Sequence, residues 1–318
     1  MLYSSAICPT EKHKNKLSLT FCTQTLSIFF FLLISCFLFS SSAFAIGGKV
    51  SALQMPAWIE RNATLSSLKP GMILQAGDKI ITGSNARALL KLDEGSLIKV
   101  GENAELNFTS LLPAEEEHGF FEATLRLVKG AFRFTTSASG KNRKRQVNVK
   151  IGDITADIRG TDIWGRSKKD KDVLCLIEGR ITANRQGEPE FEMEDPLSFY
   201  IVPKNKPASP VSPASEEQLL EWIKQTELNA GEGVLSEEGQ WAVNLMSVTN
   251  KNSIKPILTS LSASGYAATI EDTKVNGANW YRLRVSGFNS RDDAKVFAKI
   301  IAGTNDVSQT WIVKTTER

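Results

Sequence analysis

The stretch WYRLRV, residues 280–285, decides the fold of the C-terminal part of this chain. Its bulky apolar and cationic residues alternate with a period of two, which is typical of a half-buried β-strand. Trp280, Arg282 and Arg284 would stand together on one face of that strand, and the three residues between them would face a core. The pattern therefore predicts a strand that exposes one indole and two guanidinium groups.

The elements on either side of this strand alternate between strand and helix patterns. They are a strand over 241–245, a helix over 251–264, a strand over 267–271, a tight turn at 276–277, a helix from a capping box at Ser290 and Asp293 to Gly303, and a strand over 309–313. The order β-α-β-β-α-β predicts a small α+β domain with a four-stranded antiparallel sheet. Two helices cover only one face of such a sheet, so the other face stays open and carries Asn244, Trp280, Arg282, Arg284 and Trp311.

This part of the chain resembles the SPOR domain, the peptidoglycan-binding module of bacterial cell-envelope proteins. The residues that carry the resemblance are 241–247 (WAVNLMS), 265–266 (GY), 280–288 (WYRLRVSGF) and 290–294 (SRDDA). The resemblance implies a domain over 240–318 that binds glycan strands stripped of their stem peptides, which accumulate where daughter cells separate. It places the glycan-binding positions of the family on Asn244, Ser247, Trp280, Arg282 and Trp311.

The chain departs from the family pattern at two places. The family usually has Gln at the position of Asn244, and Gly-Ser-Phe where this chain has Met-Ser-Val at 246–248. The fold prediction does not depend on either position, whereas both lie in the predicted binding surface. A surface of this kind that binds a protein instead of a glycan is therefore an open alternative.

The predicted surface has the chemistry that a sugar polymer requires. A flat indole such as Trp280 can cover the apolar face of a pyranose at low entropic cost. Asn244 and Ser247 can hydrogen-bond hydroxyl and acetamido groups. A glycan without stem peptides keeps a free lactyl carboxylate, which the guanidinium of Arg282 matches in geometry and charge. In the alternative interpretation, Trp280 only packs and the arginines form a solvated face.

Residues 1–45 have the pattern of a signal peptide. Three lysines precede an apolar run over 26–39, and Ala43-Phe44-Ala45 offers a cleavage site before Ile46. The run is shorter than the roughly 20 residues that span a bilayer, which favours cleavage and a periplasmic protein without an integral membrane span. If the segment is retained, it would anchor the same domains to the inner membrane.

Removal of this segment leaves a nearly neutral chain with a single cysteine. Three lysines and one glutamate lie in it, so the net charge would fall from +3 to about +1. A charge this small argues against nucleic acid as a partner. Cys175 would be the only remaining cysteine, and its apolar neighbours predict a small thiol buried in a strand.

Residues 47–202 have short alternating runs punctuated by glycines, which predicts an all-β domain with a core over 71–184. This region resembles the FecR family in 77–83 (GDKIITG), 92–96 (LDEGS), 127–130 (LVKG), 157–163 (DIRGTDI) and 177–181 (IEGRI). Named members of that family relay a signal from outer-membrane transporters to a cytoplasmic sigma factor, through a cytoplasmic segment and one membrane span. This chain begins with a signal-peptide pattern instead. The resemblance therefore implies a periplasmic scaffold for contacts with an envelope protein.

Residues 203–239 are predicted to link the two domains. Four prolines spaced by serine and alanine predict a semi-rigid connection, followed by a short helix over 216–228 capped by Ser215. The helix could dock on either domain or on a partner.

The sequence outside the first 45 residues gives no pattern for catalysis. It holds one histidine, His118, and we find no nucleophile arrangement, nucleotide-binding loop, cofactor motif or metal-spaced cluster. The acidic residues 115–117 beside His118 would point in different directions from an irregular loop, so we assign no metal site there. No catalytic residue is nominated, and an enzyme is the weaker hypothesis.

We therefore predict a non-catalytic periplasmic protein, possessing a SPOR-like domain that docks on denuded septal glycan and a FecR-like domain that presents a protein-binding surface. The alternative is an envelope sensor, anchored by an uncleaved N-terminal segment, in which the FecR-like domain receives the signal. Mature protein that begins at Ile46 would count against the sensor, because the sensor requires the hydrophobic segment.

Overall fold

The fold is taken from a computed structural model, which describes residues 47–112, 120–136, 144–304, 307 and 309–315. The predicted signal peptide and the acidic run beside His118 lie outside the described residues. The described chain is largely β-structure with few helices, as predicted.

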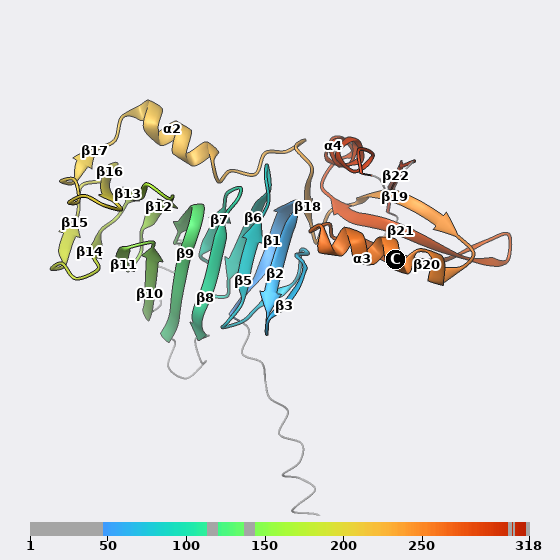
Figure 1. The fold of residues 1–318 in the computed structure, drawn as a ribbon, viewed down its shortest axis with the longest axis horizontal. Coiled ribbons are helices and arrows are strands. Elements are labelled where there is room, and N and C mark those ends of the chain that lie inside the picture. The colour runs from blue at the N-terminus through green and yellow to red at the C-terminus, as the bar shows by residue number, and fades with distance from the viewer. Residues whose placement is uncertain (1–46, 113–119, 137–143, 305–306, 308, 316–318) are drawn as a thin grey trace, which may run out of the picture. The chain divides into compact units, whose positions relative to one another are not determined.

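The N-terminal part is built from two antiparallel-rich sheets that share one long strand, β9 (Phe120–Thr135). Figure 1 shows these strands side by side, in colours from blue to yellow along the chain. The first sheet has the order β1 (Gly48–Gln54), β6 (Arg87–Leu92), β7 (Leu97–Val100), β9, β12 (Asp162–Ser167), β13 (Lys171–Glu178), β16 (Ser198–Pro203) and β17 (Ser212–Pro213), with β4 (Ile73–Leu74) on the outer side of β1. The second has the order β3 (Thr64–Ser67), β2 (Ala57–Arg61), β5 (Lys79–Thr82), β8 (Glu105–Leu112), β9, β10 (Lys144–Ile151), β11 (Ile154–Ile158), β14 (Ile181–Arg185) and β15 (Phe191–Met193).

The core of this part lies between the inner faces of the two sheets. Alternate residues of each strand point inward, as the period of two requires. Four fully buried phenylalanines, Phe108, Phe121, Phe132 and Phe134, are among the largest side chains in it. Cys175 is also fully buried in β13, and burial raises the pKa of its thiol to about 12. The predictions of an all-β region and of a buried structural thiol are confirmed.

The helix in the predicted linker packs on the β-domain. Helix α2 (Glu216–Lys224) begins at the predicted cap, where the Ser215 side chain accepts a hydrogen bond from the Gln218 amide. Trp222 stacks on the buried Trp164 ring, with ring centroids 5.0 Å apart and planes 4° apart. Lys99 also donates to the Glu227 carboxylate at 2.6 Å. The helix is shorter than predicted, and these contacts hold it against the first sheet.

The C-terminal part has the predicted order of strands and helices. It contains β19 (Trp241–Val248), η1 (Lys251–Ser253), α3 (Lys255–Ala263), β20 (Thr269–Val275), β21 (Ala278–Phe288), α4 (Arg291–Ile301) and β22 (Trp311–Lys314). The strands pair antiparallel in the order β20, β21, β19, β22. Asn276 and Gly277 both have positive φ at the predicted turn, and the Ser290 hydroxyl accepts the predicted cap bond from the Asp293 amide. The small α+β domain is thereby confirmed.

One further strand lies beside these four. Strand β18 (Val234–Ser236) pairs with β21 through Leu235 and Phe288, and it pairs with β1 over 52–54. The prediction placed β18 in the linker, because its three residues are too few for a periodic pattern. The described residues, from Gly47 onward, belong to one compact unit.

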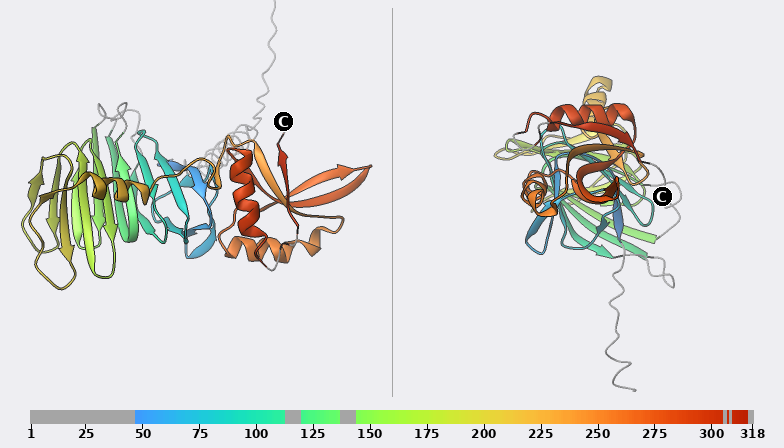
Figure 2. Two further views of the ribbon diagram at one scale, coloured as in Figure 1. Left: turned by 90° about the horizontal axis from the view of Figure 1, so that it is seen from above. Right: turned by 90° about the vertical axis from the view of Figure 1, so that its right-hand side faces the viewer.

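Helices α3 and α4 supply the core side of the C-terminal sheet. Leu261 of α3 and Phe297 of α4 belong to the same buried cluster as Val243, Leu283 and Val285 of the strands. Figure 2 shows both helices together beside the strands in its left view. We call the opposite face of the sheet, which includes Arg282 and Arg284 of β21, the open face.

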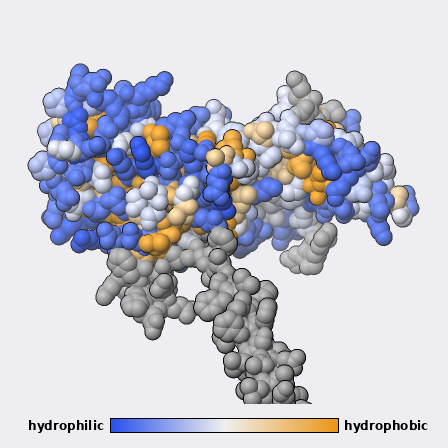
Figure 3. Space-filling model, turned by 60° about the horizontal axis from the view of Figure 1, so that its bottom comes forward, coloured by the Kyte–Doolittle hydropathy of each residue, from blue (hydrophilic) through white to orange (hydrophobic). Residues whose placement is uncertain are grey.

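Exposed apolar side chains are dispersed over the described surface. The two most exposed large ones are Leu65 and Leu112, which lie on different strands. In the view of Figure 3, hydrophobic residues form separate small patches among hydrophilic ones. None of the helices in the described part of the chain is long and apolar enough to cross a membrane.

Candidate functional site

Strand register places the six residues predicted to bind glycan on one face of the C-terminal sheet. Asn244 of β19 lies directly opposite Arg284 of β21 and Trp311 of β22, and Ser247 lies opposite Arg282. Directly opposed residues in an antiparallel pair share a face, and Trp280 follows from the alternation along β21. Their binding role stays a prediction, but the sheet does bring them together.

A bulge in β19 is what puts Asn244 and Ser247 on the same face. Residues three apart in a regular strand point to opposite faces. The register shifts between Asn244 and Met246, so one extra residue is inserted at Leu245 and the alternation is reset. The alternation alone would have placed Ser247 in the core.

The six side chains differ in how far they are exposed. Trp311 is 40% exposed, Ser247, Trp280 and Arg282 are half-buried, and Arg284 is 8% exposed. Asn244 is fully buried, between the strands of Arg284 and Trp311. It therefore forms part of the floor of the open face and does not project from it, because it sits on the central strand between two larger neighbours.

The buried polar atoms of this face lack partners within the protein. Neither the oxygen nor the nitrogen of the Asn244 amide has a hydrogen-bond partner among the described residues, and the same holds for the buried Nε of Arg282 and of Arg284. Leaving a buried polar atom without a partner costs about 1–3 kcal/mol. Four such atoms on one face of one small sheet indicate a surface suited to a polar ligand.

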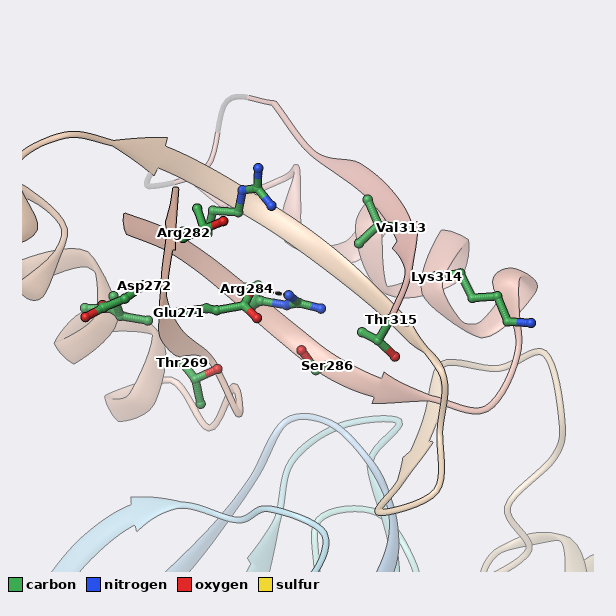
Figure 4. Close-up of a pocket in the computed structure, with 11 residues that line it drawn as sticks. Thr269, Glu271, Asp272, Arg282, Arg284, Ser286, Val313, Lys314 and Thr315 are labelled. Atoms are coloured by element: carbon green, nitrogen blue, oxygen red, sulfur yellow. Dashed lines mark hydrogen bonds and ion pairs between the residues drawn. The ribbon is translucent and has the colours of Figure 1, made fainter. Parts of the chain in front are cut away.

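A groove of about 870 Å³ runs over the open face. Its lining includes Arg282, Arg284 and Ser286 of β21, Glu271 of β20, and Lys314 at the end of β22. Figure 4 shows Arg282, Arg284 and Ser286 following one another along β21, opposite Val313, Lys314 and Thr315. The lining is mainly polar, with both signs of charge.

Only one of the two arginines in the groove is neutralised by the described part of the protein. Glu271 lies opposite Arg282 in the register, yet its carboxylate forms an ion pair with the guanidinium of Arg284. Arg282 makes no ion pair or hydrogen bond through its side chain with the described residues. Arg282 therefore offers a planar, permanently charged donor to a carboxylate from outside.

Of the eleven described residues that line this groove, the sequence predicted Arg282 and Arg284 and missed the other nine, among them Ser286 and Glu271. Ser286 continues the alternation of Trp280, Arg282 and Arg284 by one step, so a longer reading of the same pattern would have found it. Glu271 is the last residue of the predicted strand over 267–271. Its position in the groove follows only from the structure, where it forms a diagonal ion pair with Arg284.

The described residues contain no group of three or more His, Cys, Asp or Glu side chains that could hold a metal ion. The open face likewise carries no histidine or cysteine among its described residues. Its chemistry is that of hydrogen bonding, ion pairing and stacking.

Comparison with known proteins identifies two domain families. A model described as "FecR protein" matches residues 78–182, and one described as "SPOR domain" matches residues 237–314. The comparison with curated proteins gave no match. Two crystal structures of a protein from Parabacteroides distasonis ATCC 8503, proposed to be an anti-sigma factor, each align at 12% identity over 75% of this chain and 99% of the other, with a TM-score of 0.37. The chain therefore contains a FecR domain over residues 78–182 and, C-terminal to it, a SPOR domain over residues 237–314.

Proposed function

We propose that this protein is a non-catalytic component of the bacterial periplasm that docks on peptide-free glycan strands through the open face of its SPOR domain. SPOR domains bind peptidoglycan, and FecR and SPOR domains are both associated with the cell envelope. The septum, where such strands accumulate, is the proposed place of action. A signal peptide over residues 1–45 would deliver the protein there.

The observation that carries the proposal is the unpaired guanidinium of Arg282 in a polar groove. Removal of a stem peptide leaves a free lactyl carboxylate on the glycan. Arg282 is the arginine of the groove that no acidic side chain of the described chain neutralises, whereas Glu271 neutralises Arg284. An ion pair with the carboxylate would satisfy Arg282 and distinguish stripped strands from strands that still carry peptides.

The neighbouring residues have complementary roles in this proposal. Neither tryptophan lines the groove itself. The half-buried Trp280 would stack on a pyranose ring beside it, and Trp311, at 40% exposure, would offer a second ring on the same face. Ser247 would bond a hydroxyl group. Asn244 would act from the floor, where its unpartnered amide can bond a group that enters between Arg284 and Trp311.

The FecR domain would present a surface to another envelope protein. A sensor that relays a signal is the second candidate, and the match of residues 78–182 to the FecR family is the observation that favours it. Retention of the N-terminal segment as an anchor would support the sensor. Purification of the protein from the envelope and sequencing of its N-terminus separates the two, because a chain that begins at Ile46 lacks the anchor.

Sedimentation with peptidoglycan sacculi tests the proposal. The full chain is mixed with sacculi before and after an amidase removes the stem peptides, and the bound fraction is measured in the pellet. We expect binding to rise after stripping, because more lactyl carboxylates become free. Equal or lower binding to the stripped sacculi would contradict the proposal.

A further inference from the structure

We propose that the glycan groove continues beyond the SPOR sheet onto the FecR side of the chain, where Lys69 provides a second site for a carboxylate of the same strand. This inference rests on the proposed function. It concerns a longer ligand than the open face alone accommodates, and it adds a contact from a segment outside the SPOR domain.

The first observation is that two hollows share part of their lining. A second groove of about 270 Å³ is lined by Lys69, Pro70, Glu237 and residues of the SPOR domain. It shares Thr269 and Ser286 with the groove over the open face. Both of these residues are exposed, so their hydroxyl groups stand at the junction and can bond a sugar that passes from one groove to the other.

The second observation is the charge at the far end of the smaller groove. Lys49 forms an ion pair with Glu237, and the hydrogen bond to this carboxylate raises the pKa of Lys49. Lys69 makes no side-chain hydrogen bond or ion pair with the part of the chain that the structure describes. At this end of the groove Glu237 is paired with Lys49, which does not line the groove, and Lys69 is the lining cation that has no partner among the described residues.

The third observation is that the two cationic groups are held in one framework. Strand β18 lies between β1 and β21 and pairs with both. The Trp58 indole donates to the Ala263 carbonyl at 2.8 Å, and the Ala57 amide donates to the Gly265 carbonyl at 3.0 Å. Lys69 follows the buried Leu68, whose amide bonds the Ala57 carbonyl at 2.9 Å. These bonds fix the turn of Lys69 against the SPOR sheet.

Two glycines keep the floor between Lys69 and Ser286 free of side chains. A Cβ atom at Gly239 would lie 1.9 Å from the Gly287 carbonyl oxygen, and one at Gly287 would lie 2.7 Å from the Ser236 carbonyl oxygen. Gly287 also has a φ of +99°. Close backbone packing requires both glycines, so neither position adds a side chain to the path from Lys69 to Ser286.

A peptide-free strand is the occupant that fits this path. Its free carboxylates recur along the polymer, so one strand can meet two separated cationic groups, whereas a single disaccharide meets one. The second contact should then matter only for long ligands. Because Lys69 is partly exposed, its contribution is expected to be modest and to shrink at high salt.

The test compares Lys69→Ala with Lys206→Ala in the full chain. Lys206 is an exposed lysine that does not line either groove. Binding is measured to peptide-free glycans fractionated by length, from a single disaccharide to long chains. We expect Lys69→Ala to weaken binding of long chains about threefold to fivefold at low salt and to leave the disaccharide unaffected, while Lys206→Ala changes neither.

The outcomes separate this inference from the proposed function. Equal binding of long chains by Lys69→Ala and the unsubstituted protein would overturn the second site. It would not contradict glycan binding in the groove of the SPOR domain. An equal loss for the disaccharide and for long chains would also overturn it, because the effect would then not depend on length. An unsubstituted chain that binds no glycan of any length would overturn both.

Discussion

Replacing Trp280 and Arg282 together by alanine should lower the affinity of the chain for peptide-free glycan by on the order of 100-fold or more. The substitution removes the stacking surface and the unpaired guanidinium of the groove at once. Aromatic and arginine anchors at the centre of a binding surface each typically contribute about 2 kcal/mol or more. Both side chains are half-buried and Arg282 has no partner among the described residues, so their loss leaves no acidic group without its ion pair.

Sedimentation with amidase-treated sacculi measures this effect, with Arg291→Ala as the matched control. Arg291 is an exposed arginine at the start of α4, which packs on the other face of the sheet. The control variant should bind like the unsubstituted chain. Unchanged binding by a folded Trp280→Ala, Arg282→Ala double variant would show that the open face does not hold the glycan.

Replacing Asp293 by alanine should lower the free energy of unfolding by about 3–5 kcal/mol. Asp293 is fully buried, and its Oδ1 accepts hydrogen bonds from the amides of Gly231, Gly233 and Val234 at 2.9, 3.0 and 2.9 Å. Its Oδ2 accepts from the Ser290 hydroxyl at 2.5 Å. Alanine would leave three backbone donors without an acceptor, two of them buried, and it would release the segment that leads into β18.

Asp292→Ala is the control for this prediction, and urea unfolding followed by circular dichroism is the measurement. Asp292 is the neighbouring acid and is exposed, and its hydrogen bond and ion pair with Lys295 lower its pKa. Removing the Asp292 carboxylate should leave the urea midpoint of unfolding nearly unchanged. The same midpoint for both variants would mean that the carboxylate of Asp293 does not anchor the segment before β18.

Local patterns in the sequence were sufficient for the elements of the SPOR domain. The alternation in 280–285, the turn at Asn276 and Gly277 and the cap at Ser290 each depend on neighbouring residues, and each is found where it was predicted. Strand β18 and the packing of α2 were not predicted. Both depend on partners far away in the chain, β1 for the strand and Trp164 for the helix, which no local pattern reveals.

The sequence predicted two of the residues that line the groove, Arg282 and Arg284, but it did not predict their electrostatics. The resemblance to the SPOR family named Ser247, and the bulge at Leu245 supplies the reason that it shares a face with Asn244. The sequence treats Arg282 and Arg284 alike. The side-chain geometry across the two strands pairs Glu271 with Arg284. Arg282 therefore has no ion-pair partner among the described residues and can bind an external carboxylate.

The most direct test of the central claim is a nuclear magnetic resonance titration of the tryptophan indole groups. The chain has six tryptophans, each with one indole N–H signal. Adding peptide-free glycan to the full chain should shift the signals of Trp280 and Trp311, and the stacked pair Trp164 and Trp222 should stay unchanged. Shifts confined to Trp164 and Trp222, or no shift at all at glycan concentrations that sediment the protein, would contradict binding on the open face of the SPOR domain.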